Sequence, residues 1–237
     1  MCKVTIDGIA VSAPKGSTIL DAAKLAGVDI PTLCFMREIN EIGSCRVCVV
    51  EVESQEALAA ACNTPVFDGM VVRTATPRVI AARRSNVETI LATHRSECTT
   101  CKRSGTCALQ AVANSLGVAD FDRDPEYAFE EWDESFPLQR DATKCIRCMR
   151  CVAECAKVQH CAVWEVAGPA AHRGVRVAGG VDIASANCAL CGQCVTHCPT
   201  GALTALDDTS KELDALADPQ VITVVQVAPA IRSAWGE

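Results

Sequence analysis

The residues of this 237-residue chain that could do chemistry are its seventeen cysteines, most of which recur at the short spacings of metal ligands. Two runs share the pattern C-x2-C-x2-C-x3-C: Cys145, Cys148, Cys151 and Cys155, then Cys188, Cys191, Cys194 and Cys198. In proteins with this spacing, the fourth cysteine of each run ligates the cluster of the other run. We therefore expect one [4Fe–4S] cluster on Cys145, Cys148, Cys151 and Cys198, and a second on Cys155, Cys188, Cys191 and Cys194.

Disulfides and zinc are the alternatives for these cysteines. The cysteine count is odd, and the N-terminus lacks the long apolar segment of a secretory signal. Thiols stay reduced in the cytosol, where clustered cysteines are more often metal sites. Structural zinc sites usually pair two C-x2-C hooks that lie far apart in sequence, unlike these runs. We therefore favour iron–sulfur clusters and a cytoplasmic location.

The start of the chain predicts a small α+β unit. VTIDG is typical of a short strand that ends in a turn, and IAVSAP continues it as a hairpin. ILDAAKLAGV, preceded by Ser17 and Thr18, has the apolar face of an amphipathic helix, which Gly27 ends. Strand, strand and helix in this order open a β-grasp ferredoxin.

A third cysteine set follows this helix, with the looser spacing C-x10-C-x2-C-x13-C. In the strand–helix context, it predicts a [2Fe–2S] cluster on Cys34, Cys45, Cys48 and Cys62. A zinc site or buried thiols are the alternative. Gly43 and Ser44 precede the C-x2-C pair and could bring backbone N–H groups close to sulfur, where such bonds tune cluster potential.

A fourth set contains a histidine. Residues 78–94 predict a helix after Pro77, with His94 at its end, and the pattern continues as H-x3-C-x2-C-x5-C. A histidine in this place could simply complement the helix dipole. However, a neutral imidazole can supply the fourth ligand that the three cysteines lack, and it generally raises the cluster potential. We expect a third [4Fe–4S] cluster on His94, Cys98, Cys101 and Cys107.

Several residues near these sets have less specific interpretations. Cys2 and Cys161 remain outside the sets, and we expect Cys2 to be a small apolar or exposed residue and Cys161 a core residue. His197 is expected to pack or to face solvent. Lys144, Arg147 and Arg150 could stabilise a reduced cluster or be solvated surface charges. The acidic stretch 120–135 is expected to be a surface linker, with a docking face for a basic partner as the alternative.

Composition excludes several classes of function. The formal net charge of −7 argues against a nucleic-acid partner, which would favour a basic surface. No run reaches the roughly eighteen apolar residues that span a bilayer, so no direct membrane insertion is expected. The apolar stretch Val221–Ile231 predicts a buried strand. Aromatic residues make up only 4% of the chain, so each core should be thin and metal binding should supply folding energy.

The order of the four sets resembles a known group of proteins over nearly the whole chain. The stretches PTLCF, GSCRVCVVEV, ECTTCKRSGTCALQ, CIRCMRCVAEC and CALCGQCVTHCPTGAL carry the resemblance. They are similar to the N-terminal part of [FeFe] hydrogenases, to diaphorase-type subunits of NAD(P)-linked hydrogenases and formate dehydrogenases, and to the large cluster subunit of complex I. The tail VITVVQVAPAIRSAWGE looks most like the beginning of the catalytic domain of [FeFe] hydrogenases.

The resemblance implies an α+β protein with three cluster-bearing domains. The expected domains are a [2Fe–2S] β-grasp domain (1–76), a small helical [4Fe–4S] domain with one His and three Cys ligands (77–118), and a bacterial ferredoxin-like domain with two [4Fe–4S] clusters (138–208). An acidic linker (119–137) and a tail (209–237) complete the chain. One [2Fe–2S] and three [4Fe–4S] clusters are thus expected.

The resemblance also implies a function in electron transfer. The chain should relay electrons between a flavin subunit that oxidises NAD(P)H, or ferredoxin, and a hydrogenase catalytic centre on another polypeptide. Cysteine motifs for the catalytic cluster and a Gly-rich dinucleotide fingerprint are absent from the sequence, so no substrate-turnover site is expected here. Electron bifurcation would need a flavin or special centre elsewhere. The alternatives are the equivalent subunit of an NAD(P)-linked formate dehydrogenase or other oxidoreductase, a truncated hydrogenase, and a free-standing redox carrier or sensor.

Overall fold

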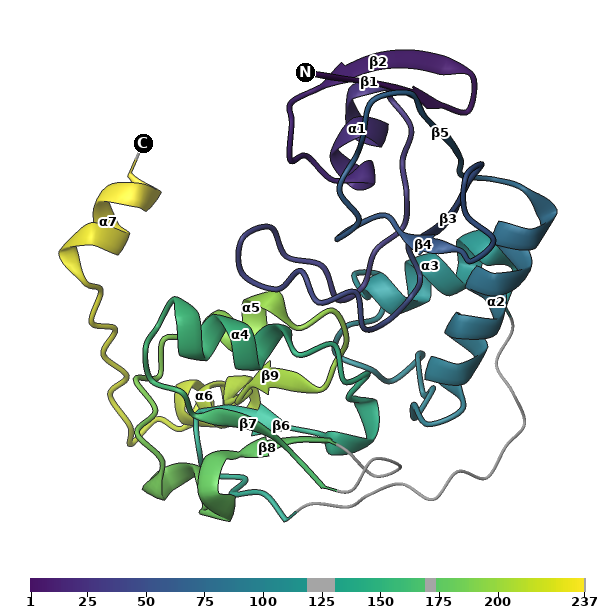
Figure 1. The fold of residues 1–237 in the computed structure, drawn as a ribbon. Helices are drawn as coiled ribbons and strands as arrows, with labels where there is room; N and C mark the ends of the chain where they lie inside the picture. Colours follow the sequence, from purple (N-terminus) through teal and green to yellow (C-terminus); the bar gives the residue numbers. More distant parts are fainter. Residues whose placement is uncertain (119–130, 169–173, 237) are drawn as a thin grey trace. The chain divides into compact units, whose positions relative to one another are not determined.

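The computed structural model describes residues 1–118, 131–168 and 174–236 (Figure 1). Contacts divide the chain into two compact units, Met1–Ala205 and Leu206–Glu237. All four predicted ligand sets fall in the first unit. In the described ranges, no helix is both long enough and apolar enough to cross a membrane. Most of the acidic stretch, predicted as a linker or docking face, lies outside the described residues.

The N-terminal part of the first unit is built on a five-stranded sheet with the order β2-β1-β5-β3-β4. The predicted hairpin is confirmed, because β1 and β2 pair antiparallel from Cys2–Ala13 to Ile6–Ile9. Strand β5 returns parallel to β1 and thereby ties the end of this region to its beginning. The strands are β1 (Cys2–Ile6), β2 (Ile9–Ala13), β3 (Val49–Val52), β4 (Ala59–Ala60) and β5 (Met70–Arg73).

The predicted amphipathic helix is confirmed as α1 (Ile19–Leu25), which contacts β1 and β2 (Figure 1). Its first turn has a reciprocal cap. The Thr18 hydroxyl accepts from the Asp21 N–H at 3.2 Å, and the Asp21 carboxylate accepts from the Thr18 N–H at 3.0 Å. The helix ends before Gly27, whose φ of 72° suits a residue without Cβ. The buried face of α1 completes the first hydrophobic core.

Helices α2 (Pro77–Leu91) and α3 (Ala108–Leu116) pack against each other. The N-cap of α2 is Thr76, and a proline occupies its first turn, where the missing N–H is not needed. The helix ends at Leu91, three residues before the predicted end. Together with the loop before β3, these helices form a second core: Leu33, Val47, Val87, Leu109, Ala113 and Val118.

Short elements form the last part of the first unit. Strand β6 pairs antiparallel with β9, and β7 pairs antiparallel with β8. Helices α4 and α5 pack together, and both begin inside a cysteine run. Their bounds are β6 (Leu138–Arg140), α4 (Arg150–Lys157), β7 (Trp164–Ala167), β8 (Gly174–Val177), α5 (Gln193–His197) and β9 (Leu203–Ala205), with 3-10 turns at Ala142–Lys144, Ala178–Gly180 and Ile183–Ser185.

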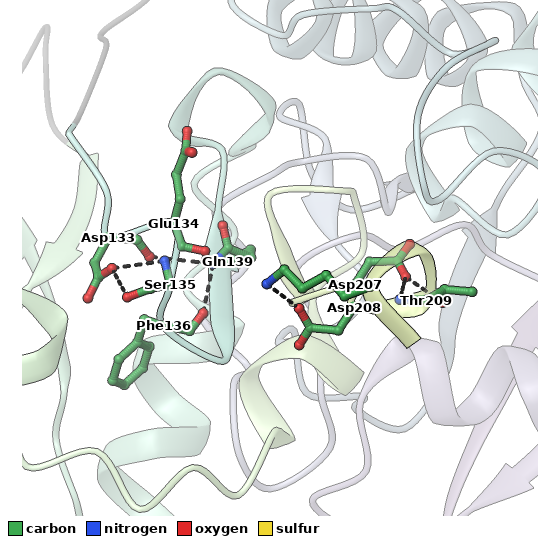
Figure 2. A network of polar contacts seen from close by, with 9 residues as sticks. Asp133, Glu134, Ser135, Phe136, Gln139, Asp207, Asp208 and Thr209 are labelled. Atoms are coloured by element: carbon green, nitrogen blue, oxygen red, sulfur yellow. Dashed lines mark hydrogen bonds and ion pairs between the residues drawn. The ribbon is translucent and has the colours of Figure 1, made fainter. Parts of the chain in front are cut away.

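A polar turn leads into β6 (Figure 2). The Asp133 carboxylate accepts from the N–H and the hydroxyl of Ser135, at 2.9 and 2.6 Å. Just before it, the Trp132 indole donates to the carbonyl of Leu138 at 2.8 Å and stacks on Trp164 with ring centroids 6.0 Å apart. The described end of the predicted acidic linker therefore packs onto the core of the following region.

The second unit contains helices α6 (Thr209–Ala217) and α7 (Pro229–Trp235). At the start of α6, the Asp207 carboxylate accepts from the N–H and the hydroxyl of Thr209, at 3.2 and 2.7 Å (Figure 2). This local bond satisfies a backbone donor that the first turn of a helix leaves open.

The buried strand predicted over Val221–Ile231 is wrong. Residues 221–228 have no regular structure, and α7 takes up the end of the segment. Ile222 and Val225 are 91% and 85% exposed. A strand requires a hydrogen-bonded neighbour, and the described residues of the second unit provide none. Pro229 then favours a helix start, because its fixed φ fits the first turn.

The cap of α1 can be tested with Thr18→Ala. Removing the hydroxyl should cost about 1 kcal/mol of the free energy of unfolding, which lowers the thermal midpoint of a chain of this size by about 2–4 °C. The measurement is anaerobic thermal unfolding. Thr18→Ser keeps the hydroxyl and should unfold near the parent temperature. An equal loss in both variants would contradict the role of the cap.

Candidate metal centres

The cysteines are available as ligands, since all seventeen lie in described residues and none forms a disulfide. Among those residues, no three Cys, His, Asp or Glu side chains converge as they would around a single metal ion. Ligands of an iron–sulfur cluster are instead distributed over two or four iron atoms.

The structure brings together the four cysteines of the N-terminal set. The thiols of Cys34 and Cys45 hydrogen-bond to each other, as do those of Cys48 and Cys62. These bonds lower the pKa of Cys34 and of Cys48 and raise the pKa of their partners. Cys34 also interacts electrostatically with Cys48 and Cys62, which links the two pairs. Cys34, Cys48 and Cys62 are buried, so the set is shielded from water.

Backbone donors surround this set. After the Cys45 thiol, the N–H groups of Cys45 and Ser44 are further causes of the lowered pKa of Cys34. The expectation that N–H groups near Gly43 approach sulfur is thus confirmed for Ser44. Gly43 itself has a φ of 63°, and a Cβ there would lie 2.7 Å from the Asn63 side-chain nitrogen. The turn therefore requires glycine.

A buried positive charge accompanies the same set. The Arg83 guanidinium donates to the Val49 carbonyl from Nε at 3.1 Å and from a terminal nitrogen at 2.9 Å. Burial lowers the pKa of Arg83, and its interaction with Cys48 opposes that shift. Arginine nevertheless remains protonated in proteins. Its charge favours added negative charge at the adjacent sulfurs.

The fourth cysteine of each C-terminal run lies near the cysteines of the other run. Cys198 interacts electrostatically with the first three cysteines of the earlier run. Cys155 in turn interacts with Cys188, and Cys194 interacts with Cys155, Cys188 and Cys191. A cavity of about 20 Å³ is lined by the first group, and one of about 70 Å³ by the second. The structure thus brings together both sets expected from the spacing.

The two runs also share an unusual backbone. Arg147 and Leu190, two residues after the first cysteine of each run, have φ of 55° and 52°. Met149 and Gly192, directly after the second cysteine, have φ of 63° and 68°. A left-handed conformation costs a non-glycine residue about 1–2 kcal/mol. Alternating conformations of this kind turn successive N–H groups toward one concavity, which suits an anionic group such as a cluster.

The chemistry of the donor sets fits an iron–sulfur cluster. Burial raises the pKa of Cys148 to about 12 and that of Cys194 to about 11. A buried thiol of this kind becomes a thiolate when a metal cation binds it. Backbone donors are already in place, since the Val163 N–H donates to Cys155 Sγ at 3.3 Å. Such N–H···S bonds are among the factors that set cluster potentials.

The fourth set lies along the chain between the end of α2 and the start of α3. His94 is buried just beyond the end of α2, and Cys98 is exposed. Cys101 closes a turn on Cys98, and Cys107 is the residue before α3. His94 therefore precedes a loop that contains all three cysteines, as the sequence predicts.

This loop contacts the set that contains Cys198. The Arg103 guanidinium donates to the Cys198 carbonyl at 2.7 Å. The Cys107 thiol donates to the Pro199 carbonyl at 3.6 Å, and the N–H of Ala108 donates to the same oxygen at 3.0 Å. The two ligand sets are thus joined through backbone atoms next to their cysteines.

The remaining candidates lie beside the sets. Cys2 is buried in β1, so of its two expected placements the apolar one applies. Cys161 is half-buried, donates to the Gln159 carbonyl at 3.4 Å and lines the larger cavity. His197 lies with Nε2 3.7 Å from a carboxylate oxygen of buried Glu154.

The three basic residues predicted near the earlier run differ in their contacts. Lys144 forms an ion pair with Asp141 at 3.0 Å. The charges of Arg147 and Arg150 act on Cys145 and Cys148, respectively, and lower the pKa of those thiols against the larger effect of burial.

Sequence reasoning missed the side chains that bind backbone carbonyls beside the cysteines. Arg83 and Arg103 are examples, and Asn40 is another. No local pattern distinguishes such a residue from a surface one, because its partner is remote in sequence. Paired substitution among relatives is the signal that could have identified them.

Comparisons with known proteins agree with this architecture. Residues 1–77 match the model of a 2Fe-2S iron-sulfur cluster binding domain. Residues 83–121 match the NADH-ubiquinone oxidoreductase-G iron-sulfur binding region, and residues 144–202 match a 4Fe-4S dicluster domain. These matches define the class: an α+β protein with one 2Fe-2S domain and further 4Fe-4S regions.

Two curated relatives and one solved structure narrow the class. The NADP-reducing hydrogenase subunit HndD of Solidesulfovibrio fructosivorans is 44% identical over all of this chain, which spans 42% of HndD. The NADPH-Fe(3+) oxidoreductase subunit alpha of Geobacter sulfurreducens is 38% identical over 86% of this chain and 24% of its own length. A chain in the crystal structure of an NAD+-reducing [NiFe]-hydrogenase has a TM-score of 0.76 and 30% identity, with 86% of this chain and 87% of that chain covered.

The chain belongs to the family of iron–sulfur electron-transfer subunits of NAD(P)-linked oxidoreductases, which includes these hydrogenase subunits and the 75 kDa subunit of NADH-ubiquinone oxidoreductase. The resemblance inferred from the cysteine motifs is thereby confirmed. The chain spans less than half of the curated relatives described here.

The exchange of fourth cysteines can be tested with Cys155→Ala. It should remove one [4Fe–4S] cluster, with a loss of about four iron atoms per chain, because a cluster of this type has four ligand positions. The measurement is iron analysis with EPR of the reduced chain. Cys161→Ala is the matched control, since Cys161 lines the same cavity without belonging to a set. Equal iron loss in both variants would contradict the assignment.

The contact between the histidine set and the Cys198 loop can be tested with Gly201→Ala. A Cβ at Gly201 would lie 2.8 Å from Cys101 Sγ, closer than real Cβ contacts. Because a ligand sulfur cannot move freely, this variant should selectively lose the [4Fe–4S] signal of the histidine set. Gly174→Ala is the control, because a Cβ there meets no atom of the described residues within 4 Å. An unchanged EPR spectrum of Gly201→Ala would contradict the tight contact.

Proposed function

We propose that the chain holds one [2Fe–2S] and three [4Fe–4S] clusters and relays electrons between an NAD(P)H-oxidising flavin subunit, or ferredoxin, and a hydrogenase catalytic centre outside this sequence. A β-grasp domain (1–76) holds the [2Fe–2S] cluster, a small helical domain (77–118) one [4Fe–4S] cluster, and a ferredoxin-like domain (138–208) the other two. The ligand sets are Cys34/Cys45/Cys48/Cys62, His94/Cys98/Cys101/Cys107, Cys145/Cys148/Cys151/Cys198 and Cys155/Cys188/Cys191/Cys194.

When bound, iron–sulfur clusters accept and release single electrons without making or breaking bonds in a substrate. The residues of this chain form the environment of each cluster. Buried cysteines keep water from the sulfurs, and N–H groups such as those of Ser44 and Val163 donate to them. Arg83 and Arg150 place positive charge beside Cys48 and Cys148. These factors govern how readily a cluster takes up an electron.

Two of the cysteines in the ligand sets are exposed, and we infer that electrons pass to partners near them. Cys98 and Cys191 are exposed, whereas the N-terminal set has three buried members. Leu190, beside Cys191, is also 55% exposed. We infer that the set with Cys191 faces one partner and that the histidine set faces another, with the set of Cys145 and Cys198 between them.

The extent of the match to HndD is the observation that carries the hydrogenase assignment. The match covers the whole chain, the tail included, whereas the Geobacter relative matches 86% of it. The tail is also the part whose sequence resembles the start of a hydrogenase catalytic domain. The second candidate is a subunit of an NAD(P)H oxidoreductase without hydrogenase activity, and the similarity to the Geobacter relative favours it. A subunit of a formate dehydrogenase is a further alternative.

The test is to purify the native assembly anaerobically and to identify its other components and their cofactors. We expect a flavin-containing component together with a hydrogen-activating centre, and cluster reduction by both NAD(P)H and H2. Molybdenum or tungsten with formate oxidation would instead support the formate dehydrogenase alternative. An assembly reduced by NAD(P)H but inert to H2 would overturn the hydrogenase assignment.

A further inference from the structure

One side chain joins two predicted ligand sets directly. The Asn40 side-chain nitrogen, Nδ2, donates to the carbonyl oxygen of Cys34 at 2.7 Å and to that of Cys148 at 2.9 Å. Cys34 belongs to the N-terminal set and Cys148 to the set completed by Cys198. The connection between the two cysteines therefore passes through a single nitrogen atom, although Asn40 and Cys148 are 108 residues apart in sequence.

The orientation of this amide follows from its partners. Both partners are carbonyl oxygens, which only accept hydrogen bonds, so the NH2 group and not the oxygen of Asn40 must face them. The two hydrogens of that group suffice for one bond to each carbonyl. Asn40 is only 2% exposed, so water cannot readily replace either bond. A buried carbonyl left without a donor costs about 1–3 kcal/mol.

The loop that carries Asn40 is fixed on both sides of it. The backbone groups of Met36 and Asn40 bond each other in both directions, at 2.8 and 2.9 Å. The Arg150 guanidinium donates to the Phe35 carbonyl at 2.9 Å, and Lys157 Nζ donates to the Ile39 carbonyl at 2.6 Å. Helix α4 thus supplies two further attachments to this loop, but neither ends on a cysteine.

We propose that Asn40 is the positioning residue that couples the N-terminal cluster to the neighbouring [4Fe–4S] cluster. Its bonds complete a short route from Cys34, through one amide nitrogen, to Cys148. The transfer moves one electron from one ligand set to the other, so one set is oxidised as the other is reduced, and no proton or covalent bond changes. This inference rests on the proposed function, because it presupposes that both sets hold clusters.

A merely structural role for Asn40 predicts a different result from a coupling role. If the amide only satisfies two buried carbonyls, its loss should lower stability in the same way as loss of other loop attachments. If it couples the two sets, its loss should slow electron equilibration between them while iron content stays the same. Lys157→Met provides the comparison, since it releases the same loop without touching the bonds to Cys34 and Cys148.

The experiment uses the full chain with its clusters loaded anaerobically. Asn40→Leu and Asn40→Asp have side chains of similar size but cannot donate as the amide does. A photogenerated flavin radical delivers one electron to each chain, and equilibration between the [2Fe–2S] and [4Fe–4S] clusters is followed by absorbance and freeze-quench EPR. We expect several-fold slower equilibration in both Asn40 variants and an unchanged rate in Lys157→Met. Iron content should stay at the parent value, and the midpoint potentials of each variant are measured so that rates are compared at equal driving force.

Each outcome either supports or overturns the coupling role of Asn40. Parent-like rates in a cluster-loaded Asn40 variant would overturn the inference and leave the proposed function intact. Equal slowing in Lys157→Met would also overturn it, because general attachment of the loop would then suffice. If Asn40→Leu fails to load clusters, Asn40→Asp decides by the same criterion. Failure of both variants while Lys157→Met loads would assign Asn40 to folding and overturn the coupling role. A parent chain without clusters would overturn the proposed function and, with it, the inference.

Discussion

The first unit depends on hydrogen bonds to the backbone carbonyls of its cysteine loops. These loops have little regular structure, so their carbonyls lack the partners that helices and sheets provide. Side chains remote in sequence supply the donors: Asn40 to Cys34 and Cys148, and Arg103 to Cys198. Arg83 likewise donates to Val49, the first residue of β3, directly after Cys48. Each of these bonds fixes the backbone next to a predicted ligand. The bonds of Asn40 and Arg103 also connect one ligand set to another.

These hydrogen bonds explain how the cysteine loops can hold strained backbone conformations and still adopt one defined arrangement. Left-handed conformations at Arg147, Met149 and Leu190 are unfavourable for an isolated chain. They turn N–H groups toward the cysteines, where a bound anionic cluster would compensate the cost. The hydrophobic core next to the runs includes three of their cysteines, Cys151, Cys155 and Cys198. Folding and cluster loading should therefore be closely linked in this region.

Local sequence signals were sufficient for part of the fold and for the composition of the sites. The hairpin and α1 follow from alternation, the Thr18 cap and Gly27, and all three signals act within a few residues. The repeated spacing of the cysteines also predicted which fourth cysteine would approach which run. The contacts of Cys198 and Cys155 agree with that placement, and the ligand assignment itself stays a prediction.

Other features depend on partners that no local pattern reveals. The segment Val221–Ile231 has the composition of a strand, but composition does not supply a neighbouring strand. The end of α2 lies at Leu91, because the following residues turn toward the loop of the histidine set. Nothing in the sequence around Asn40 indicates that its side chain will contact Cys148. Side-chain contacts over such separations are set by tertiary packing, which propensity cannot represent.

The central claim is that four ligand sets on one chain hold four clusters. The most direct test is Mössbauer spectroscopy with iron and zinc analysis of the anaerobically loaded chain. The account predicts about fourteen iron atoms per chain, divided between one [2Fe–2S] and three [4Fe–4S] clusters, and no stoichiometric zinc. Stoichiometric zinc, or about ten iron atoms with one ligand set empty, would contradict it.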